Sequence, residues 1–293
     1  MKILNVSAGA VGAYFCGRLA QKGTEVAVTV RSDRELVAAN GFDIKSIAGD
    51  FIFKPQAVLN SASEYKDNAD YIILTTDPAV TFGRLLDLPM PKRLKAQYDN
   101  PGLRRFSSYH AAFACDAAEL PFDGDLIFDV PEEYVAELGT RQLIVREFSH
   151  EPSYAPEGKN ILQTMTFCFD EDCCEFIRLR KNDKEAYKAR KARLAELLMM
   201  LIEDHCPTLR GRLTLIDFWT PATYERFVSS QIGSFMSFAI PEKFLPIPLD
   251  NSVEGVDNLF LATQWLQSPG GLPTAADQGR GVINRINKIE AKR

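Results

Sequence analysis

The pattern of apolar and polar positions predicts alternating strands and helices at the start of the chain. Residues 2–6 and 25–30 are apolar runs with the length of buried strands, and apolar positions recur at helical spacing between them. A third apolar run, residues 71–76, is followed by Asp77 and then by Pro78, which breaks it. Strands that alternate with helices are typical of a parallel sheet, so the chain is predicted to open with a β-α-β unit.

Further along, the pattern changes to longer strand-like runs and one long helix. Thr220 and Pro221 are suited to an N-cap and a first helical turn, and Gly158 suits a turn that needs positive φ. The predicted strands are residues 103–115, 142–148, 161–169 and 213–218, and the longest predicted helix is 182–206. This combination predicts an α+β domain with a mixed sheet, suited to form the floor of a substrate site.

The end of the chain predicts a strand, a glycine loop and a helix. Residues 259–263 are a short apolar run, and apolar positions recur at helical spacing over residues 274–289. Between them, Gly270 and Gly271 let the main chain pass close to a flat ligand. The helix start that follows would stabilise negative charge, such as a phosphate or a reduced flavin. The alternative is a strand-turn-helix that only closes a sheet.

Composition narrows the class of protein. A chain of 293 residues with 46% apolar content can bury one large core or two modest ones, and a net charge of -5 disfavours nucleic acid and anionic membranes as partners. Its six cysteines lack metal-ligand spacing, and adjacent Cys173 and Cys174 are poorly placed to bridge each other. No apolar run is long enough to cross a membrane. We therefore expect a cytoplasmic protein with reduced thiols, no metal site and a small-molecule substrate.

The loop after the first predicted strand carries part of a dinucleotide-binding motif. In that motif one glycine forms the tight turn, a second lets the backbone approach the pyrophosphate, and a third packs helix on strand. Gly9 and Gly12 fill the second and third roles, whereas Ser7 stands in the first. Ser7, Gly9 and Gly12, together with Ala10 and Val11, are the residues predicted to contact the nucleotide. The alternative is a structural β-α-β unit without a ligand.

Arg31 follows the second predicted strand. An acidic residue there would bind a ribose 2′-hydroxyl, whereas arginine can pair with a 2′-phosphate. Arg31 therefore favours NADP over NAD or FAD at this site, the alternative being an ordinary surface charge. Thr76, at the end of the third strand, and Gln264, beside the glycine loop, are further candidates for cofactor contacts.

Five stretches, residues 1–4, 9–12, 19–23, 26–31 and 41–45, carry a first resemblance. Together they resemble the ketopantoate reductase family over roughly the first quarter of the chain. The resemblance implies an NADPH-binding half in which Gly9, Gly12 and Arg31 contact the cofactor. It does not extend to the chemistry, because Asp77 stands where that family usually has a lysine and nothing resembles its helical catalytic domain.

Three stretches, residues 147–159, 219–226 and 262–273, carry a second resemblance. They resemble the phytoene desaturase, carotenoid isomerase and retinol saturase group of FAD-dependent oxidoreductases, over roughly residues 70–289. This resemblance implies FAD and an apolar, isoprenoid-like substrate. It also implies that Gly270, Gly271 and Leu272 face the redox ring.

Groups for acid–base chemistry are sparse. His110, His150 and His205 are far apart in sequence and form no nucleophile or metal motif, so structural or surface roles are predicted for them. Tyr224 and the aromatic segment 235–238 are candidates for lining an apolar cavity, or for ordinary core packing. No catalytic residue is predicted, which fits redox chemistry carried by a cofactor.

The two resemblances predict that both ends of the chain build one α/β dinucleotide-binding domain. Residues 1–76 and 256–293 would form this Rossmann-like domain, in which residues 259–263 join the first sheet, and residues 77–255 would be an inserted α+β substrate domain. The predicted function is an oxidoreductase of the phytoene desaturase type that uses FAD or, as the less favoured cofactor, NADP. The alternatives are an NADPH-dependent 2-dehydropantoate 2-reductase-like enzyme and a catalytically inactive nucleotide-binding or scaffold protein.

Overall fold

The computed structural model describes residues 1–6, 8–74, 76–239 and 249–291, and the chain divides into two compact units. The first is Met1–Leu86 and the second is Asp87–Arg293. The predicted domain boundaries after residues 76 and 255 stay predictions.

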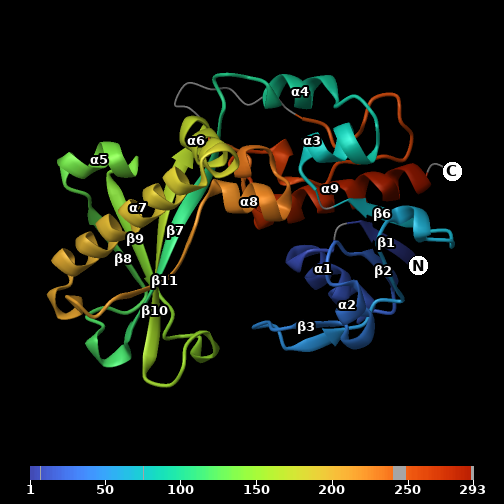
Figure 1. Ribbon diagram of the computed structural model, residues 1–293. Coiled ribbons are helices and arrows are strands. Elements are labelled where there is room, and N and C mark those ends of the chain that lie inside the picture. Colours follow the sequence, from blue (N-terminus) through green and yellow to red (C-terminus); the bar gives the residue numbers. More distant parts are fainter. Residues whose placement is uncertain (7, 75, 240–248, 292–293) are drawn as a thin grey trace. The chain divides into compact units, whose positions relative to one another are not determined.

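The first unit is built on a parallel sheet in the order β5-β2-β1-β6 (Figure 1). The β-branched runs predicted as strands form its centre, and Val26 and Val28 are buried there. The elements are β1 (Lys2–Val6), α1 (Ala10–Ala20), β2 (Glu25–Thr29), α2 (Arg34–Asn40), β3 (Phe42–Ile44), β4 (Phe51–Phe53), β5 (Ala57–Leu59), η1 (Ala62–Glu64), β6 (Tyr71–Leu74), α3 (Pro78–Val80) and the π-helical turn η2 (Thr81–Leu85). The predicted β-α-β opening and the strand after residue 70 are thus confirmed.

The hairpin β3–β4 was not predicted, and it packs on α1. Arg18 of α1 donates to the carbonyls of Ala48 and Gly49, at 3.2 and 3.0 Å. Its guanidinium also lies 4.4 Å from the ring centre of Phe51. A Cβ on Gly17 would lie 2.7 Å from the Phe51 ring, so the helix needs glycine where the hairpin approaches.

One residue of the central strand opposes the stability of this unit. Asn5 is fully buried in β1, on the same side as Ile3, which packs with Cys16 and Val28. Its amide nitrogen and oxygen meet no hydrogen-bond partner at ordinary distance, and the one polar group that interacts with the amide is the Cys16 thiol, where Asn5 opposes the rise that burial causes in the thiol pKa. A buried amide with so weak a partner has lost its hydration and gained little in return.

We predict that Asn5→Val stabilises the protein, by about 1–2 kcal/mol, because it removes that desolvation cost and suits a strand. Urea unfolding of the two proteins measures the change. Asn68→Val, at an exposed position, is the control and should leave the free energy of unfolding nearly unchanged. Destabilisation by Asn5→Val would mean that the contact of the amide with the Cys16 thiol outweighs the desolvation cost.

The second unit is built on an antiparallel sheet in the order β11-β7-β10-β9-β8, with β12 also paired to β7. The strands predicted between residues 103 and 218 and the longest predicted helix are confirmed, but every described strand pair of this sheet is antiparallel, so the predicted mixed sheet is wrong, and β8, α5 and α6 were not predicted. The elements are α4 (Lys92–Tyr98), β7 (Arg104–Asp116), η3 (Ala117–Glu119), β8 (Asp125–Asp129), α5 (Glu132–Leu138), β9 (Gln142–Glu147), η4 (Pro152–Tyr154), β10 (Lys159–Phe169), α6 (Asp170–Asn182), α7 (Lys184–His205), η5 (Pro207–Leu209), β11 (Thr214–Trp219), α8 (Pro221–Val228), η6 (Gln231–Gly233), β12 (Phe238–Ala239), η7 (Gln264–Leu266) and α9 (Leu272–Glu290).

Helices α6 and α7 cover one face of this sheet and form the main core with it (Figure 1). Alternate residues of β7 and β10 point into that core, among them Phe113 and Leu162, which pack with Phe176 and Leu198. All four are fully buried. The intervening residues of both strands therefore lie on the opposite face.

The edge strand β11 is irregular. Thr214 pairs with Ala114 and Trp219 with His110, but the register shifts between Leu215 and Asp217. The extra residue, Ile216, is 54% exposed. Such a bulge bends the strand and interrupts its ladder of hydrogen bonds.

The stretch that begins at Glu147 is tied together by one buried carboxylate. Glu147 accepts hydrogen bonds from the backbone of Gly124 and Ser149 and from the Asn160 amide, at 2.6–2.9 Å. Burial alone would raise the pKa of Glu147, but these bonds hold the pKa at about 2. Gly158, in the turn before β10, has the positive φ that was predicted.

The predicted strand at residues 259–263 is wrong. The segment makes only an isolated bridge, between Phe260 and Ser252. Its backbone is partnered by a loop instead of a strand, because Leu261 donates to the carbonyl of Asn251 and accepts from the Asn251 amide. In the described part of the chain, all four strands of the parallel sheet come from residues 1–86. The prediction that residues 259–263 add a strand to this sheet is therefore wrong. The helix after the glycine loop is confirmed as α9.

Candidate functional site

The loop between β1 and α1 has room for a ligand beside its backbone. Gly9 caps α1 in an extended conformation (φ -79°, ψ -171°), and no atom lies within 4 Å of the position that a Cβ would take there. Ala10 and Val11 follow it in the first helical turn and are exposed. The first N–H groups of a helix have no partner within the helix, so they are available to an anion.

Two predicted contact residues follow the neighbouring strands. Arg31 comes after β2 and Thr76 after β6, and both strands are parallel to β1 and flank it. They therefore lie beyond the same edge of the sheet as Gly9. Arg31 is exposed, whereas Thr76 is half-buried and shares a 2.7 Å hydrogen bond with the Thr81 hydroxyl.

The other parts of the glycine motif differ in what they contribute. Gly12 is buried on α1, in keeping with its predicted packing role. Ser7, predicted in the tight turn, lies outside the described residues. Contacts of any of these residues with a nucleotide stay predictions.

The glycine loop of the second unit is held by its own side chains. Gln264 accepts a 2.7 Å hydrogen bond from the N–H of Gly271 and donates to the carbonyl of Phe235. Gly271 has φ +93° and precedes α9, and Leu272 is 56% exposed. The Gln264 amide thus fixes the loop from inside, and its predicted contact with a cofactor stays a prediction.

Gly270 marks a close approach of two backbone segments. A Cβ there would lie 2.7 Å from the nitrogen of Ser237, which donates to the carbonyl of Pro269. Ser237 is fully buried, and its hydroxyl has no hydrogen-bond partner. The loop therefore carries one unsatisfied polar group beside its glycines.

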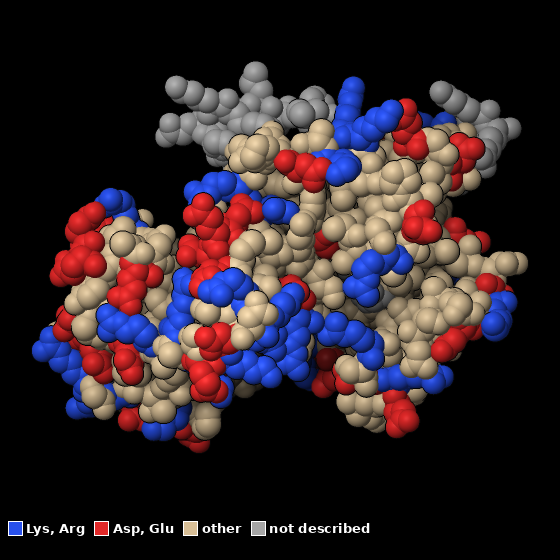
Figure 2. Space-filling view, turned by 45° about the horizontal axis from the view of Figure 1, so that its top comes forward, with Lys and Arg blue, Asp and Glu red and all other residues tan. Residues whose placement is uncertain are grey.

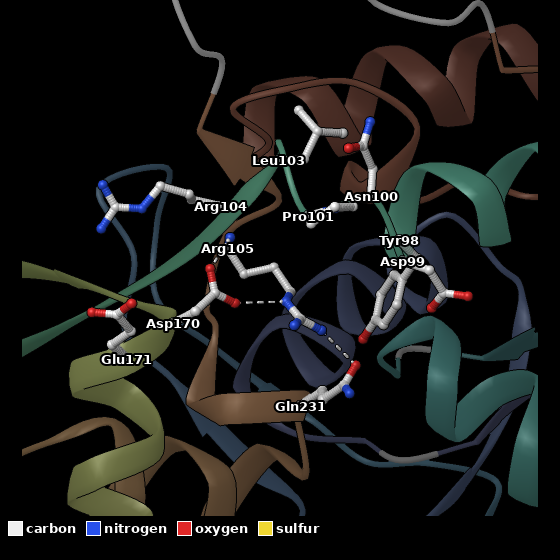
Figure 3. Close-up of a pocket in the computed structure, with 10 residues that line it drawn as sticks. All are labelled: Tyr98, Asp99, Asn100, Pro101, Leu103, Arg104, Arg105, Asp170, Glu171 and Gln231. Carbon is white, nitrogen blue, oxygen red and sulfur yellow. Dashed lines mark hydrogen bonds and ion pairs between the residues drawn. The ribbon is translucent and has the colours of Figure 1, made fainter.

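A hollow of about 810 Å³ at the start of β7 contains a paired arginine (Figure 3). Arg105 binds Asp170 through its backbone N–H and its Nε, and donates to Gln231 at 2.8 Å. Its guanidinium lies 5.5 Å from the ring centre of Tyr98. These contacts tie β7 to the start of α6, which indicates a structural link.

The sheet face opposite α6 and α7, which we call the His110 face, carries one apolar row between rows that include charged side chains such as Arg146 and Asp129. Ile127 lies opposite Ile144, and Ile144 lies opposite Met165. The register of β7 and β10 brings Met165 opposite His110, which is opposite Trp219. Ile127 is 57% exposed, and Ile144 and Met165 are half-buried. One apolar row thus crosses the strands and ends at a polar group.

His110 is the centre of a network of neutral polar side chains. Its Nε2 lies 2.7 Å from the Ser108 hydroxyl and 3.1 Å from the Tyr224 hydroxyl, and its Nδ1 lies 3.0 Å from Nε2 of Gln163. The Trp219 ring stacks on the imidazole at 4.8 Å, and its indole N–H donates to Tyr224. The network could not be recognised in the sequence because its members come from four separate elements.

His110 is only 6% exposed, and burial lowers its pKa to about 4. The imidazole is therefore neutral near pH 7. The other two histidines lie elsewhere: His205 stacks on Phe128 and His150 lies near Phe148.

This pKa predicts how stability depends on pH. The unfolded chain takes up a proton on His110 near pH 6.5, whereas the folded protein does so only near pH 4. The contribution of His110 is thus complete above pH 6.5 and is lost as the pH falls towards 4. Urea unfolding at pH 7 and pH 5 should show that His110→Gln loses less stability on acidification than the parent protein, by about 1–2 kcal/mol.

The exposed His150 provides the control for that measurement. His150→Gln should keep the pH dependence of the parent. An equal loss of stability in the parent and in His110→Gln would show that His110 is not held neutral by burial.

These observations define the class of the first unit: a Rossmann-like α/β unit with a parallel sheet and a glycine-containing loop at a helix start. Residues 3–77 match the family model described as Ketopantoate reductase PanE/ApbA. The predicted resemblance of the first quarter of the chain to this family is therefore confirmed.

Two curated relatives match parts of the chain. The "Uncharacterized oxidoreductase YkpB" of Bacillus subtilis (strain 168) is 29% identical over 125 residues, which are 42% of this chain and 40% of that protein. The "4,4'-diaponeurosporene oxygenase" of Staphylococcus haemolyticus (strain JCSC1435) is 26% identical over 151 residues, 51% of this chain and 28% of that protein. The chain thus spans less than half the length of either relative. The partial oxygenase match gives the second resemblance loose support.

Among solved structures, 2-dehydropantoate 2-reductase from Methylococcus capsulatus is 36% identical over 30% of each chain. The TM-score is 0.28, so this likeness concerns the matched sequence and not the whole fold.

The remaining features concern both units. All six cysteines are free thiols. Among the residues described, no group of three or more His, Cys, Asp or Glu side chains is placed to hold a metal ion, and none of the helices is long and apolar enough to span a membrane. Positive and negative side chains intermingle on the face drawn in Figure 2.

Proposed function

We propose that this chain is an NADP(H)-dependent oxidoreductase whose first unit binds the dinucleotide at the β1–α1 loop. The observation that carries the proposal is Gly9: it starts α1, its backbone is open on the side where a Cβ would stand, and it lies in the segment that matches the ketopantoate reductase family. That family binds NADPH, which favours NADP over FAD at this loop.

The residues of the loop fit the chemistry of the dinucleotide. The first N–H groups of α1 offer hydrogen bonds and a positive dipole end to the pyrophosphate, and Gly9 lets it come close. Arg31, at the end of the neighbouring strand, offers a bidentate partner for the 2′-phosphate. The nicotinamide, when bound, supplies the hydride; the chain binds and orients it.

The second unit supports an apolar substrate. The His110 face offers Ile127, Ile144 and Met165 in one row, a surface suited to a hydrocarbon. An isoprenoid-like substrate fits this surface better than a small ketoacid does. A 2-dehydropantoate 2-reductase-like reaction is the alternative within the same class, supported by the matched family. A cytoplasmic location is part of the proposal.

Gly9→Ala provides the sharpest test of the nucleotide site. The added methyl meets no protein atom and φ is ordinary, so the fold should be unaffected. The methyl would occupy space needed by the pyrophosphate. We expect NADPH to raise the melting temperature of the parent protein and to bind the variant at least about tenfold more weakly, a loss of ~1.4 kcal/mol.

Gly83→Ala is the matched control, because Gly83 also has open space at the Cβ position and belongs to the same unit. It should bind NADPH as the parent does. Equal NADPH affinity in all three proteins would reject the β1–α1 loop as the site. Binding of neither NADPH nor FAD to the parent would favour the alternative of an inactive scaffold.

A second candidate, FAD binding at the glycine loop of the second unit, is favoured by Ser237 and Leu272. The unsatisfied hydroxyl of Ser237 lies beside Gly270, and Leu272 is exposed at the start of α9. If flavin binds there, the purified protein should be yellow, and Leu272→Asp should release the flavin by repelling its phosphates or its reduced ring.

The aspartate in this variant would stabilise the helix start, so loss of flavin could not be attributed to unfolding. Leu272→Asn, of the same size without the charge, should retain more flavin. A colourless parent protein that gains no stability from added FAD would reject this second candidate.

A further inference from the structure

Two buried cysteines meet where β10 passes into α6. Cys168 is the last residue but one of β10, and Cys173 is the fourth residue of α6. Their sulfurs lie 3.6 Å apart, and the Cys173 thiol donates to the carbonyl of Cys168, also at 3.6 Å. Both side chains belong to the main core, where they are 3% and 0% exposed. The fold thus holds two thiols in contact between the sheet and the helix layer that covers it.

We infer that Cys168 and Cys173 form a reversible disulfide when the protein meets a small disulfide oxidant, so that β10 and α6 become covalently joined. One cysteine thiolate attacks the oxidant, bonds to one of its sulfurs and releases the other as a thiolate. The second cysteine then attacks the protein sulfur of this mixed disulfide and releases the remaining small thiol. The two cysteines lose two electrons and two protons, and the oxidant is reduced to two thiols. The inference is independent of the proposed function.

The geometry leaves a short distance to close. The sulfurs of a disulfide are about 2.05 Å apart, so those of Cys168 and Cys173 need to approach by a further ~1.5 Å. The start of α6 is also tied to the sheet by other residues. Asp170 accepts hydrogen bonds from the backbone N–H and the Nε of Arg105 on β7, at 3.0 and 3.1 Å. The disulfide would therefore fasten a junction that the fold already forms.

Two other cysteines near this junction have different surroundings. Cys174 follows Cys173 directly but is exposed, and adjacent cysteines are poorly placed to bridge each other. Cys115 is buried in the same core, and its sulfur lies 3.9 Å from the carbonyl oxygen of Asn160. The turn from strand to helix, and not closeness in the sequence, thus selects Cys168 as the partner of Cys173.

Burial determines how fast the pair reacts. The hydrogen bond with Cys173 and burial both raise the pKa of Cys168, so this thiol is protonated near pH 7. Because the thiolate is the attacking form, exchange in the folded protein is slow at neutral pH. An oxidant also has to reach two buried sulfurs, which favours a small uncharged disulfide over a large or charged one. The pair therefore responds to sustained oxidising conditions.

Hydroxyethyl disulfide, which is small and uncharged, tests the inference in the Cys174→Ala protein. Trypsin releases residues 160–178 as one peptide, in which Cys168 and Cys173 are then the two remaining cysteines. After incubation at about pH 8.5, where thiols ionise, the protein is unfolded, alkylated and digested. We expect a peptide about 2 Da lighter than the reduced one and free of alkyl groups.

Redox buffers of hydroxyethyl disulfide and mercaptoethanol give the equilibrium constant for forming the protein disulfide. We expect this constant to be at least about tenfold larger in the folded protein than in urea, because the fold holds the sulfurs in contact. Equilibrium is approached from the reduced and from the oxidised protein, so slow exchange does not distort the result.

Cys115→Ala, added to Cys174→Ala, is the matched control, because it removes another buried thiol from the same core. It should leave the disulfide unchanged. Cys173→Ala, added instead, should leave Cys168 free or in a mixed disulfide with the reagent. A peptide that keeps two alkylated cysteines throughout, or an equilibrium constant no larger in the folded protein than in urea, overturns the inference.

Discussion

The alternation of side chains along β7 and β10 is the constraint on which the second unit depends. Successive residues of a strand point to opposite faces, so the residues that fill the core under α6 and α7 also determine what faces the other way. Phe113 and Leu162 are fixed in the core, and the register between the two strands then places Met165 opposite His110. A shift by one residue would exchange the two sets and bury the imidazole network in the hydrocarbon core.

The first unit depends on a different constraint, the common direction of its strands. Because β1, β2 and β6 are parallel, the residues that follow them lie beyond one edge of the sheet. Gly9, Arg31 and Thr76 share that edge although they are far apart in the sequence. The direction of the strands is thus sufficient to place these three residues at one edge, and at Gly9 the backbone is open on the side where a Cβ would stand.

Local patterns in the sequence were sufficient for most elements but not for the pairing of distant ones. The apolar runs predicted β1, β2, β7, β9, β10 and β11, and Thr220 with Pro221 predicted the start of α8, where a capping box is present. Residues 259–263 have the same apolar character, but their backbone is bound by Asn251 of a preceding loop, a tertiary contact that no local pattern reveals.

The two candidate sites also differ in whether local sequence was sufficient to predict them. The loop and helix start at Gly9 could be predicted because they belong to one short motif around Gly9 and Gly12, and the contact of this loop with a nucleotide stays a prediction. The His110 network could not be predicted. The register of three strands and the position of α8 are what bring Ser108, Gln163, Trp219 and Tyr224 to His110. Each residue alone has the ordinary explanation that sequence analysis gave it.

The bulge in β11 has a consequence for how the protein behaves in concentrated solution. An edge strand offers unpaired N–H and C=O groups to any passing chain, and β11 also exposes Leu215 and Ile216. The register shift between Leu215 and Asp217 breaks the regular spacing that another strand would need in order to extend the sheet. The bulge therefore disfavours aggregation by strand pairing at this edge of the sheet.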